Sequence, residues 1–286
     1  MLKITRAKSA GFCFGVRRAV HTALETCQNT HKPVHMLGDI VHNERVVAQL
    51  REAGIRVVKS LDEVDDGVLL IRAHGAEPAT YEEAKTRGLQ IVDATCPLVK
   101  EIHERARELH AAGYPLLVIG DHGHDEVKGI AAQVPDAIVV STPEEVRSLG
   151  RKFRRIGVVA QSTQDLDNVR AIVSELIPIC IEIRFVNTIC YPTAKHQMEI
   201  RAMPLENDVM IVVGSFTSAN TKRMTQISRG LNPRTYQVTG ADDLCADWFS
   251  GVNTVGIHAG ASTPDSVVEE VIARIRQLAG TPVEIV

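Results

Sequence analysis

The sequence predicts an α/β protein of three small tandem domains, each with a mostly parallel sheet, in a pseudo-threefold arrangement around a central cavity. Three observations lead to this prediction. Apolar runs recur along the 286 residues, and each is followed by a polar loop and an amphipathic helix. Three cysteines stand 83 and 94 residues apart, and two further sets of polar residues recur with them. A period of about 90 residues exceeds that of common solenoid repeats and suits a small α/β domain.

The strand-like runs are continuously apolar rather than alternating, at residues 68–71, 116–119 and 209–213. This pattern is typical of strands that are buried on both faces of a parallel sheet. Helical periodicity follows in several places, for example over residues 43–53, 98–112 and 264–278. Strands that alternate with helices predict parallel sheets with right-handed crossovers.

The repeat also predicts where the domains begin and end. We expect boundaries near residues 95 and 189, which gives domains of residues 1–95, 96–189 and 190–280. The tail, residues 281–286 (TPVEIV), has strand character, and we expect it to dock on the first domain.

The three regularly spaced cysteines, Cys13, Cys96 and Cys190, each follow a strand pattern and open a helical one. A helix N-terminus carries a partial positive charge, which favours the thiolate form that binds metals. Three such thiolates, one for each repeat, suggest one shared metal site. The other three cysteines lack this context, and we interpret them as core or surface thiols: Cys27, Cys180 and Cys245.

Two further layers of polar residues recur behind the cysteines. The second layer consists of His42, His124, Ser218 and Asn220. The third layer consists of His74, Ser162, Thr163 and Ser262. Both follow strand-like runs, and ligand-binding loops of parallel sheets gather at the C-terminal ends of the strands. We therefore expect nine polar loops to surround one cavity.

These residue types indicate a metal centre beside an anion pocket. Three thiolates suit a four-iron four-sulfur cluster with one iron open to substrate, although such clusters usually have four cysteines. Zinc with three cysteines and one histidine is the competing interpretation. The histidine, serine and asparagine side chains are hydrogen-bond donors that suit a diphosphate. Glu126, two residues after His124, is a candidate proton donor, and helix capping explains it equally well at this stage.

Composition narrows the functional classes. With 44% apolar and 23% charged residues, the chain has the material for a packed core. A net charge of −3 and no long basic tract argue against a nucleic-acid partner. The chain opens without a signal-like apolar region, and no apolar run approaches the ~18 residues of a membrane span. We therefore expect a cytoplasmic protein that has no membrane partner.

Nine motifs run in order from residue 10 to residue 265: AGFCFGV, GDIVHN, RAHG, VDATCPLV, HGHDEVKG, QST, NTICYPT, VVGSFTSAN and AGASTPD. In these motifs the chain resembles the family of 4-hydroxy-3-methylbut-2-enyl diphosphate reductases. The resemblance implies three α/β domains around an iron–sulfur cluster, and the last step of the non-mevalonate isoprenoid pathway. In that step an allylic diphosphate loses its hydroxyl group, with two electrons and two protons, to give isopentenyl and dimethylallyl diphosphate.

The resemblance also implies roles for single residues. Cys13, Cys96 and Cys190 would hold one 4Fe–4S cluster. We expect aerobic handling to degrade this cluster to a form with three irons or to remove it. The implied diphosphate ligands are His42, His74, His124, Ser218, Asn220 and Ser262. Glu126 would deliver protons together with His124, and Ser162 and Thr163 would assist. A ferredoxin or a flavodoxin would supply the electrons.

The chain departs from the family pattern at three places. Ala219 stands where the family has a second serine, and Ser162 stands where it has a threonine. Residues 194–197 read Ala-Lys-His-Gln instead of Thr-Asn-Arg-Gln, so Lys195 and His196 are candidates for replacing the lost polarity. Two other functional classes stay open at this point: a zinc-dependent lyase or hydrolase of a phosphorylated substrate, and a non-catalytic relative that binds diphosphates or senses a cluster.

Overall fold

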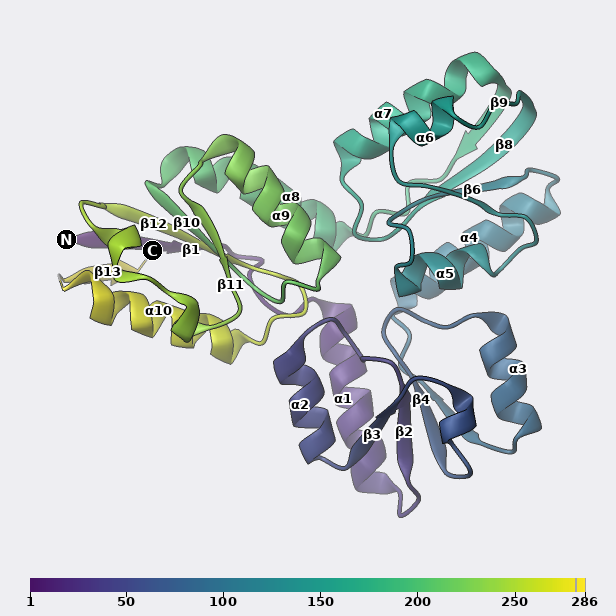
Figure 1. Ribbon diagram of the computed structural model, residues 1–286, viewed down its shortest axis with the longest axis horizontal. Helices are drawn as coiled ribbons and strands as arrows, with labels where there is room; N and C mark the ends of the chain where they lie inside the picture. Colours follow the sequence, from purple (N-terminus) through teal and green to yellow (C-terminus); the bar gives the residue numbers. More distant parts are fainter. Residues whose placement is uncertain (281, 286) are drawn as a thin grey trace. The chain divides into compact units, whose positions relative to one another are not determined.

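The computed structural model describes residues 1–280 and 282–285, and strands alternate with helices along almost the whole chain (Figure 1). The strands are β1 Leu2–Arg6, β2 Val34–Leu37, β3 Ile55–Val58, β4 Val68–Ile71, β5 Gln90–Asp93, β6 Leu116–Ile119, β7 Ile138–Val140, β8 Phe153–Ala160, β9 Cys180–Phe185, β10 Val209–Val213, β11 Thr235–Val238, β12 Thr254–Ala259 and β13 Val283–Ile285. The helices are α1 Phe14–Asn29, α2 Glu44–Glu52, α3 Pro78–Thr86, α4 Pro97–Ala111, α5 Asp125–Ala131, α6 Pro143–Arg147, α7 Leu166–Leu176, α8 Tyr191–Glu206, α9 Ala219–Leu231 and α10 Asp265–Ala279. The predicted α/β class is confirmed.

The described strands form three sheets, and every strand pairing in them is parallel. The strand orders are β3-β2-β4-β5, β7-β6-β8-β9 and β11-β10-β12-β1-β13. The first four strands of the third sheet repeat the topology of the other two sheets. One topology is therefore used three times, as the sequence repeat predicted.

The structure shifts this repeat by one strand from the expected domain ranges. β1 lies between β12 and β13 in the third sheet, and it takes the place that β5 and β9 take in the other two. Each regularly spaced cysteine therefore follows the strand in the fourth position of a sheet, instead of preceding the first strand of a new sheet. β13 pairs with β1, so residues 283–285 dock as a strand on the third sheet, while residues 281 and 286 of the tail lie outside the described part of the chain.

By its internal contacts the chain divides into two units. The first unit comprises Met1–Arg17, His42–Val46 and the described residues from Tyr191 onward, and it holds the third sheet. The second unit comprises Arg18–Val41 and Val47–Cys190, and it holds the other two sheets.

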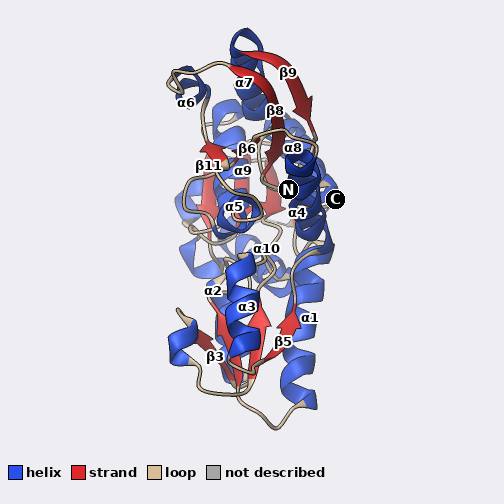
Figure 2. Cartoon of the chain, turned by 90° about the vertical axis from the view of Figure 1, so that its right-hand side faces the viewer, coloured by secondary structure: helices blue, strands red, loops and turns tan. Residues whose placement is uncertain are grey.

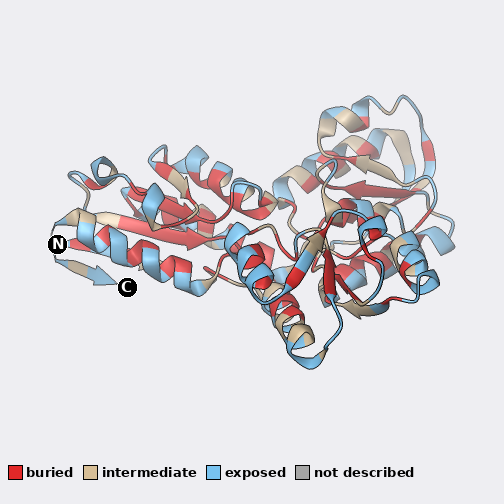
Figure 3. Cartoon of the chain, turned by 60° about the horizontal axis from the view of Figure 1, so that its bottom comes forward, coloured by how far each residue is buried: buried red, intermediate tan, exposed pale blue. Residues whose placement is uncertain are grey.

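Helices cover both faces of the central strands. In the first unit α8 and α9 pack on one face of the sheet and α10 on the other (Figure 1). In the second unit α4 and α5 cover one face of the β6–β8 strands, while α6 and α7 cover the opposite face. Figure 2 shows strands as inner layers between helices, and Figure 3 shows that the strands are mostly buried. Burial on both faces explains why these strands are continuously apolar.

The local elements agree closely with the sequence. All residues of β4, β6 and β10 are buried. α2, α4 and α10 begin and end within one residue of the predicted helices. In the described residues no helix combines the length and the apolar character that a membrane span requires.

Candidate active site

The three cysteines share one backbone setting. Each is partly buried and directly precedes a helix: α1, α4 or α8. Each also donates its backbone N–H to a carbonyl group in the loop after the neighbouring strand: Cys13 to Ala261 at 3.1 Å, Cys96 to Ala73 at 2.9 Å and Cys190 to Ser162 at 3.0 Å. The cysteine of each sheet is therefore tied to the third-layer loop of the same sheet.

At Cys13 the expected effect of the helix N-terminus, a lower thiol pKa, is not the dominant one. Burial raises the pKa of Cys13 above its ordinary value. The backbone N–H groups of Val16 and Gly15 and the charge of Arg17 lower this pKa, but by less. Desolvation therefore outweighs the helix N-terminus at this cysteine, so binding a metal would have to displace the thiol proton.

Glu199 fixes the loop that leads to Cys13. Its carboxylate accepts hydrogen bonds from the backbone N–H of Ser9 at 3.0 Å and from the Ser9 hydroxyl at 2.6 Å. Glu199 belongs to α8, which is far from this loop in the sequence. No local sequence pattern marks Glu199, because an acidic residue on a helix usually faces solvent.

In the second unit Glu126 and Ser162 form a buried pair. The side chain of Glu126 lies in the first turn of α5, and the residue is 2% exposed. Its two carboxyl oxygens accept the backbone N–H of Ser162 at 2.6 Å and the Ser162 hydroxyl at 2.9 Å. Since the Ser162 carbonyl accepts the N–H of Cys190, a continuous hydrogen-bonded chain joins Glu126 to a cysteine backbone.

Burial raises the pKa of Glu126. The two hydrogen bonds from Ser162 lower it, and the nearby charge of Asp121 raises it further. A carboxyl group of this kind keeps its proton to a higher pH than an exposed glutamic acid does. A raised pKa favours the protonated form and so suits a proton donor. Capping of α5 belongs to His124, whose ring accepts the N–H of Glu126, so helix capping no longer explains Glu126.

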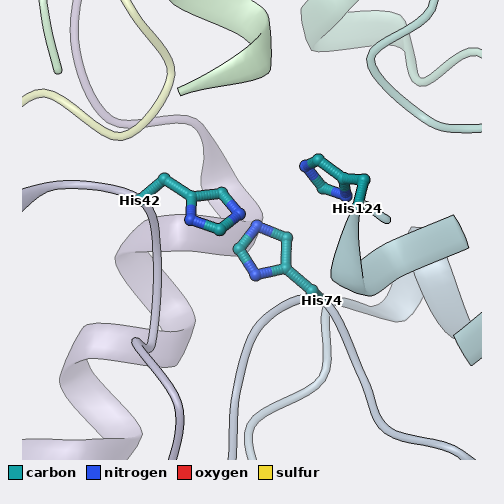
Figure 4. Close-up of side chains that lie close together, drawn as sticks. All are labelled: His42, His74 and His124. Carbon is teal, nitrogen blue, oxygen red and sulfur yellow. The ribbon is translucent and has the colours of Figure 1, made fainter. Parts of the chain in front are cut away.

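His74 and His124 lie next to each other in the second unit. Their ring centroids are 5.5 Å apart and the rings are nearly perpendicular, at 84°. Figure 4 shows the two imidazoles, drawn together with His42, which belongs to the other unit. Nδ1 of His124 accepts the N–H of Glu126 at 3.2 Å, which places the proton of the neutral ring on Nε2. Nε2–H of His124 can therefore donate to an anionic oxygen.

Two contacts that the sequence did not predict hold this region together. Arg72, two residues before His74, forms an ion pair of 2.6 Å with Asp125, next to His124. The buried Gln161 accepts the N–H of Asp121 at 2.9 Å and donates to the Thr163 hydroxyl at 3.0 Å. These contacts connect the loops of the second and third layers. A glutamine at the end of an apolar strand was the only sequence signal for them.

The first unit holds the remaining predicted ligands. Ser218 caps α9 by accepting the N–H of Thr221 at 3.3 Å. Ser262 donates to the carbonyl of His42 at 3.3 Å, which ties a third-layer residue to a second-layer one. Asn220 is buried, and among the described residues its side-chain Nδ2 has no hydrogen-bond acceptor. A buried donor of this kind is costly unless a ligand or water satisfies it.

The substituted positions behave differently from one another. Ala219 is partly buried between Ser218 and Asn220 and is the first residue of α9. Lys195 is exposed, whereas His196 is buried with its ring 5.1 Å from that of His258. His196 therefore packs in the interior and does not supply exposed polarity.

Three buried histidines make the stability of the protein depend on pH. Burial lowers the pKa of His103 and His258 to about 4 and that of His196 to about 3. The unfolded chain takes up these protons near pH 6.5, so the free energy of unfolding decreases as the pH falls below that value. The decrease is up to about 1.4 kcal/mol per pH unit for each histidine. The raised pKa of Glu126 acts in the opposite direction, because the folded chain keeps this proton to a higher pH than the unfolded chain does.

We expect the thermal midpoint of the metal-free protein to fall between pH 6.5 and pH 4.5, measured by circular dichroism. The variant His258→Gln removes one buried imidazole and should make this dependence shallower. An identical dependence in wild type and variant would contradict the assignment of His258 as a neutral buried group.

The family described as LytB protein matches residues 4–276 of the chain. A relative from Geobacter metallireducens, named 4-hydroxy-3-methylbut-2-enyl diphosphate reductase, is 43% identical over 277 residues, which cover 97% of this chain and 98% of the relative. A relative of the same name from Aquifex aeolicus is 39% identical over 282 residues and covers 97% of each chain.

Two solved structures are also similar. One is described as (E)-4-hydroxy-3-methyl-but-2-enyl diphosphate reductase, the terminal enzyme of the non-mevalonate pathway, with a TM-score of 0.72, 38% identity and coverage of 97% of this chain and 100% of that chain. The other is E-1-hydroxy-2-methyl-but-2-enyl-4-diphosphate reductase from Plasmodium falciparum, with a TM-score of 0.89, 28% identity and coverage of 99% and 91%. In each of the three parallel sheets the fourth strand leads to a cysteine that directly precedes a helix. With these matches over nearly its whole length, the chain belongs to the LytB family.

Proposed function

We propose that this protein is an oxidoreductase that converts 4-hydroxy-3-methylbut-2-enyl diphosphate to isopentenyl and dimethylallyl diphosphate. The reaction breaks the allylic C–O bond and consumes two electrons and two protons. One proton leaves with the hydroxyl group as water, and the other is added to carbon. The full-length similarity to reductases of this name supports the proposal.

The observation that carries the proposal is the setting shared by the three cysteines. Each thiol is partly buried at the start of a helix, and each backbone is fixed by the neighbouring loop. This donor set suits an iron–sulfur cluster, for which cysteine thiolates are the usual ligands. We propose that Cys13, Cys96 and Cys190 together hold one 4Fe–4S cluster. When bound, the cluster supplies electrons to the substrate.

The polar layers would bind the diphosphate. Since Nδ1 of His124 accepts the N–H of Glu126, the proton of its neutral ring lies on Nε2, and the adjacent His74 adds a second imidazole. Asn220 contributes a buried Nδ2 that lacks an acceptor in the described residues, as expected for a group that awaits an anion. We assign the remaining contacts to His42, Ser218 and Ser262.

Glu126 would provide the proton for the leaving hydroxyl group. Burial raises its pKa, which favours the protonated form, and its hydrogen bonds to Ser162 hold it in one orientation. The proton would pass from Glu126 to the leaving hydroxyl group through His124 and through the hydroxyl and diphosphate groups of the substrate. Thr163 stands beside Ser162 with its hydroxyl hydrogen-bonded to Gln161, so it supports the same loop.

The external partners belong to the same proposal. A ferredoxin or a flavodoxin would deliver single electrons, and the reaction would take place in the cytoplasm. Neither a nucleic acid nor a membrane has a role in this scheme.

An anaerobic assay tests the proposal directly. Protein purified without oxygen is incubated with dithionite, a viologen dye and the allylic diphosphate, and both dye oxidation and products are measured. We expect two electrons consumed for each substrate and a mixture of the two isomeric products. A colourless protein that contains zinc would instead support a zinc-dependent enzyme. A brown protein that binds the substrate without turnover would support a non-catalytic relative.

Ala219→Ser should lower KM with little change in kcat. The new hydroxyl would stand between Ser218 and Asn220 at the start of α9, where serine is well tolerated. A hydrogen bond to a charged oxygen is worth about 1.5–3 kcal/mol, and less if water already fills the place. The contact is remote from the breaking C–O bond and should act equally on ground state and transition state. Steady-state kinetics of both proteins with the same reductant measure the effect. A large rise in kcat at constant KM would show that this loop aligns the substrate instead.

A further inference from the structure

His103 lies close to three of the segments of the second unit that carry candidate site residues, those of Cys96, His74 and Glu126. It lies on α4, the helix that begins directly after Cys96, and it is 8% exposed. No sequence pattern distinguishes it, because it is a single histidine within an amphipathic helix.

The imidazole ring of His103 packs against two glycines. A Cβ atom built on Gly75 would lie 3.1 Å from Cε1 of His103, and one built on Gly129 would lie 3.4 Å from Nε2. Gly75 directly follows His74, and Gly129 lies three residues after Glu126 in α5. The ring therefore lies next to both the His74 loop and the helix that carries Glu126.

Glycine is required at position 75, where the His74 loop passes the ring of His103. Gly75 has a φ of +77°, a left-handed conformation that side-chain-bearing residues rarely adopt. The absence of a Cβ atom also makes room for the ring. The loop can therefore turn closely around His103 and present His74 beside His124.

The electrostatic surroundings keep the ring uncharged. Burial lowers the pKa of His103 to about 4, and the nearby cations Arg107 and Lys100 lower it further, whereas Asp93 opposes them. At neutral pH the ring is therefore a flat, neutral group. Among the described residues its Nε2 has no hydrogen-bond partner, so its contacts with the glycines are made by packing.

We propose that His103 is a positioning residue that sets the spacing between the His74 loop and the N-terminal turn of α5. Shortening this side chain leaves a space between two glycine backbones, and both segments can then move toward α4. The relative orientation of the His74 and His124 rings would change, and with it any anion that the two rings bind together. The inference relies on the proposed function only for the use that it gives to these two imidazoles.

The test compares three variants of the full chain. His103→Ala removes the ring, and His103→Gln replaces it with a neutral planar group of similar length. Leu109→Ala is the matched control, because Leu109 is also buried on the same helix but packs near Gly157. Thermal midpoints measure how far each variant loses stability.

The main measurement is the long-range ¹H–¹⁵N spectrum of the histidine ring nitrogens, which needs neither iron nor substrate. We expect His103→Ala to shift or broaden the signals of His74 and His124, while Leu109→Ala leaves them unchanged even if it melts at a lower temperature. His103→Gln should restore the wild-type signals. The dissociation constant of inorganic diphosphate should rise roughly tenfold in His103→Ala and stay within about twofold in Leu109→Ala.

Equal spectral changes in His103→Ala and Leu109→Ala would overturn the proposal, since any loss of core packing would then have the same effect. Unchanged signals in His103→Ala, or no restoration in His103→Gln, would overturn it as well. A wild-type protein that fails to reduce the allylic diphosphate would refute the proposed function, but it would leave this spectroscopic result standing.

Discussion

Glu126→Gln is expected to lower kcat by roughly 10²–10⁴-fold, the usual contribution of a general acid. The amide has nearly the same shape as the carboxyl group, and its oxygen can still accept the N–H of Ser162. The carboxyl group is buried and burial raises its pKa, so a neutral amide of the same size should leave the fold intact. The substitution removes only the transferable proton. Steady-state rates with a chemical reductant, iron content and substrate affinity should be measured together.

Glu145→Gln is a suitable control for this experiment. Glu145 also accepts a backbone N–H, from Ser141, but it is partly exposed and hydrogen-bonds the exposed His122. We expect its turnover to stay close to that of wild type. The residual rate of Glu126→Gln should also lose the decrease at high pH that deprotonation of an acid produces. If Glu126→Gln turned over within about threefold of wild type, Ser162 and Thr163 would be the next candidates for the role.

Replacing any one of Cys13, Cys96 and Cys190 with serine is expected to abolish turnover, because each would remove one of three cluster ligands. A serine hydroxyl is a poor substitute for a thiolate toward iron, so the cluster should be lost or become unstable. Visible absorption and iron per chain, measured on anaerobically purified protein, follow the cluster directly. The metal-free variants should keep the far-ultraviolet circular dichroism of the wild type, because the backbone contacts of the three cysteines do not involve sulfur.

The other cysteines provide an internal control of the same chemistry. Cys180 lies on the edge strand β9, Cys27 is near the end of α1, and Cys245 is exposed. Serine at these positions should retain the cluster and most of the activity. Loss of the cluster in Cys245→Ser, together with an intact cluster in Cys96→Ser, would require a different ligand set.

The local pattern of the sequence determined the fold class and the kind of residue at each strand end. Continuous apolar runs predicted β4, β6 and β10, because a strand that is covered on both faces has no solvent-exposed position for a polar side chain. The cysteine contexts predicted thiols at the starts of α1, α4 and α8, because the change from strand to helix pattern is visible within a few residues. The candidate ligands of the two polar layers also stand in loops that directly follow strands or, for Asn220, in the first turn of the next helix, because a polar loop after an apolar run is visible in the sequence.

Which distant segments pair or pack against one another is visible only in the three-dimensional structure. β1 takes the fourth place of the third sheet, beside β12, although almost the whole chain separates the two strands. The pairing of Glu126 with Ser162 and the packing of His103 against Gly75 likewise join residues that no local pattern relates. The direction of two pKa shifts also follows from this packing, since burial raises the pKa of both Cys13 and Glu126. Loss of water around a group depends on every segment packed against it, so the sequence near that group does not determine it.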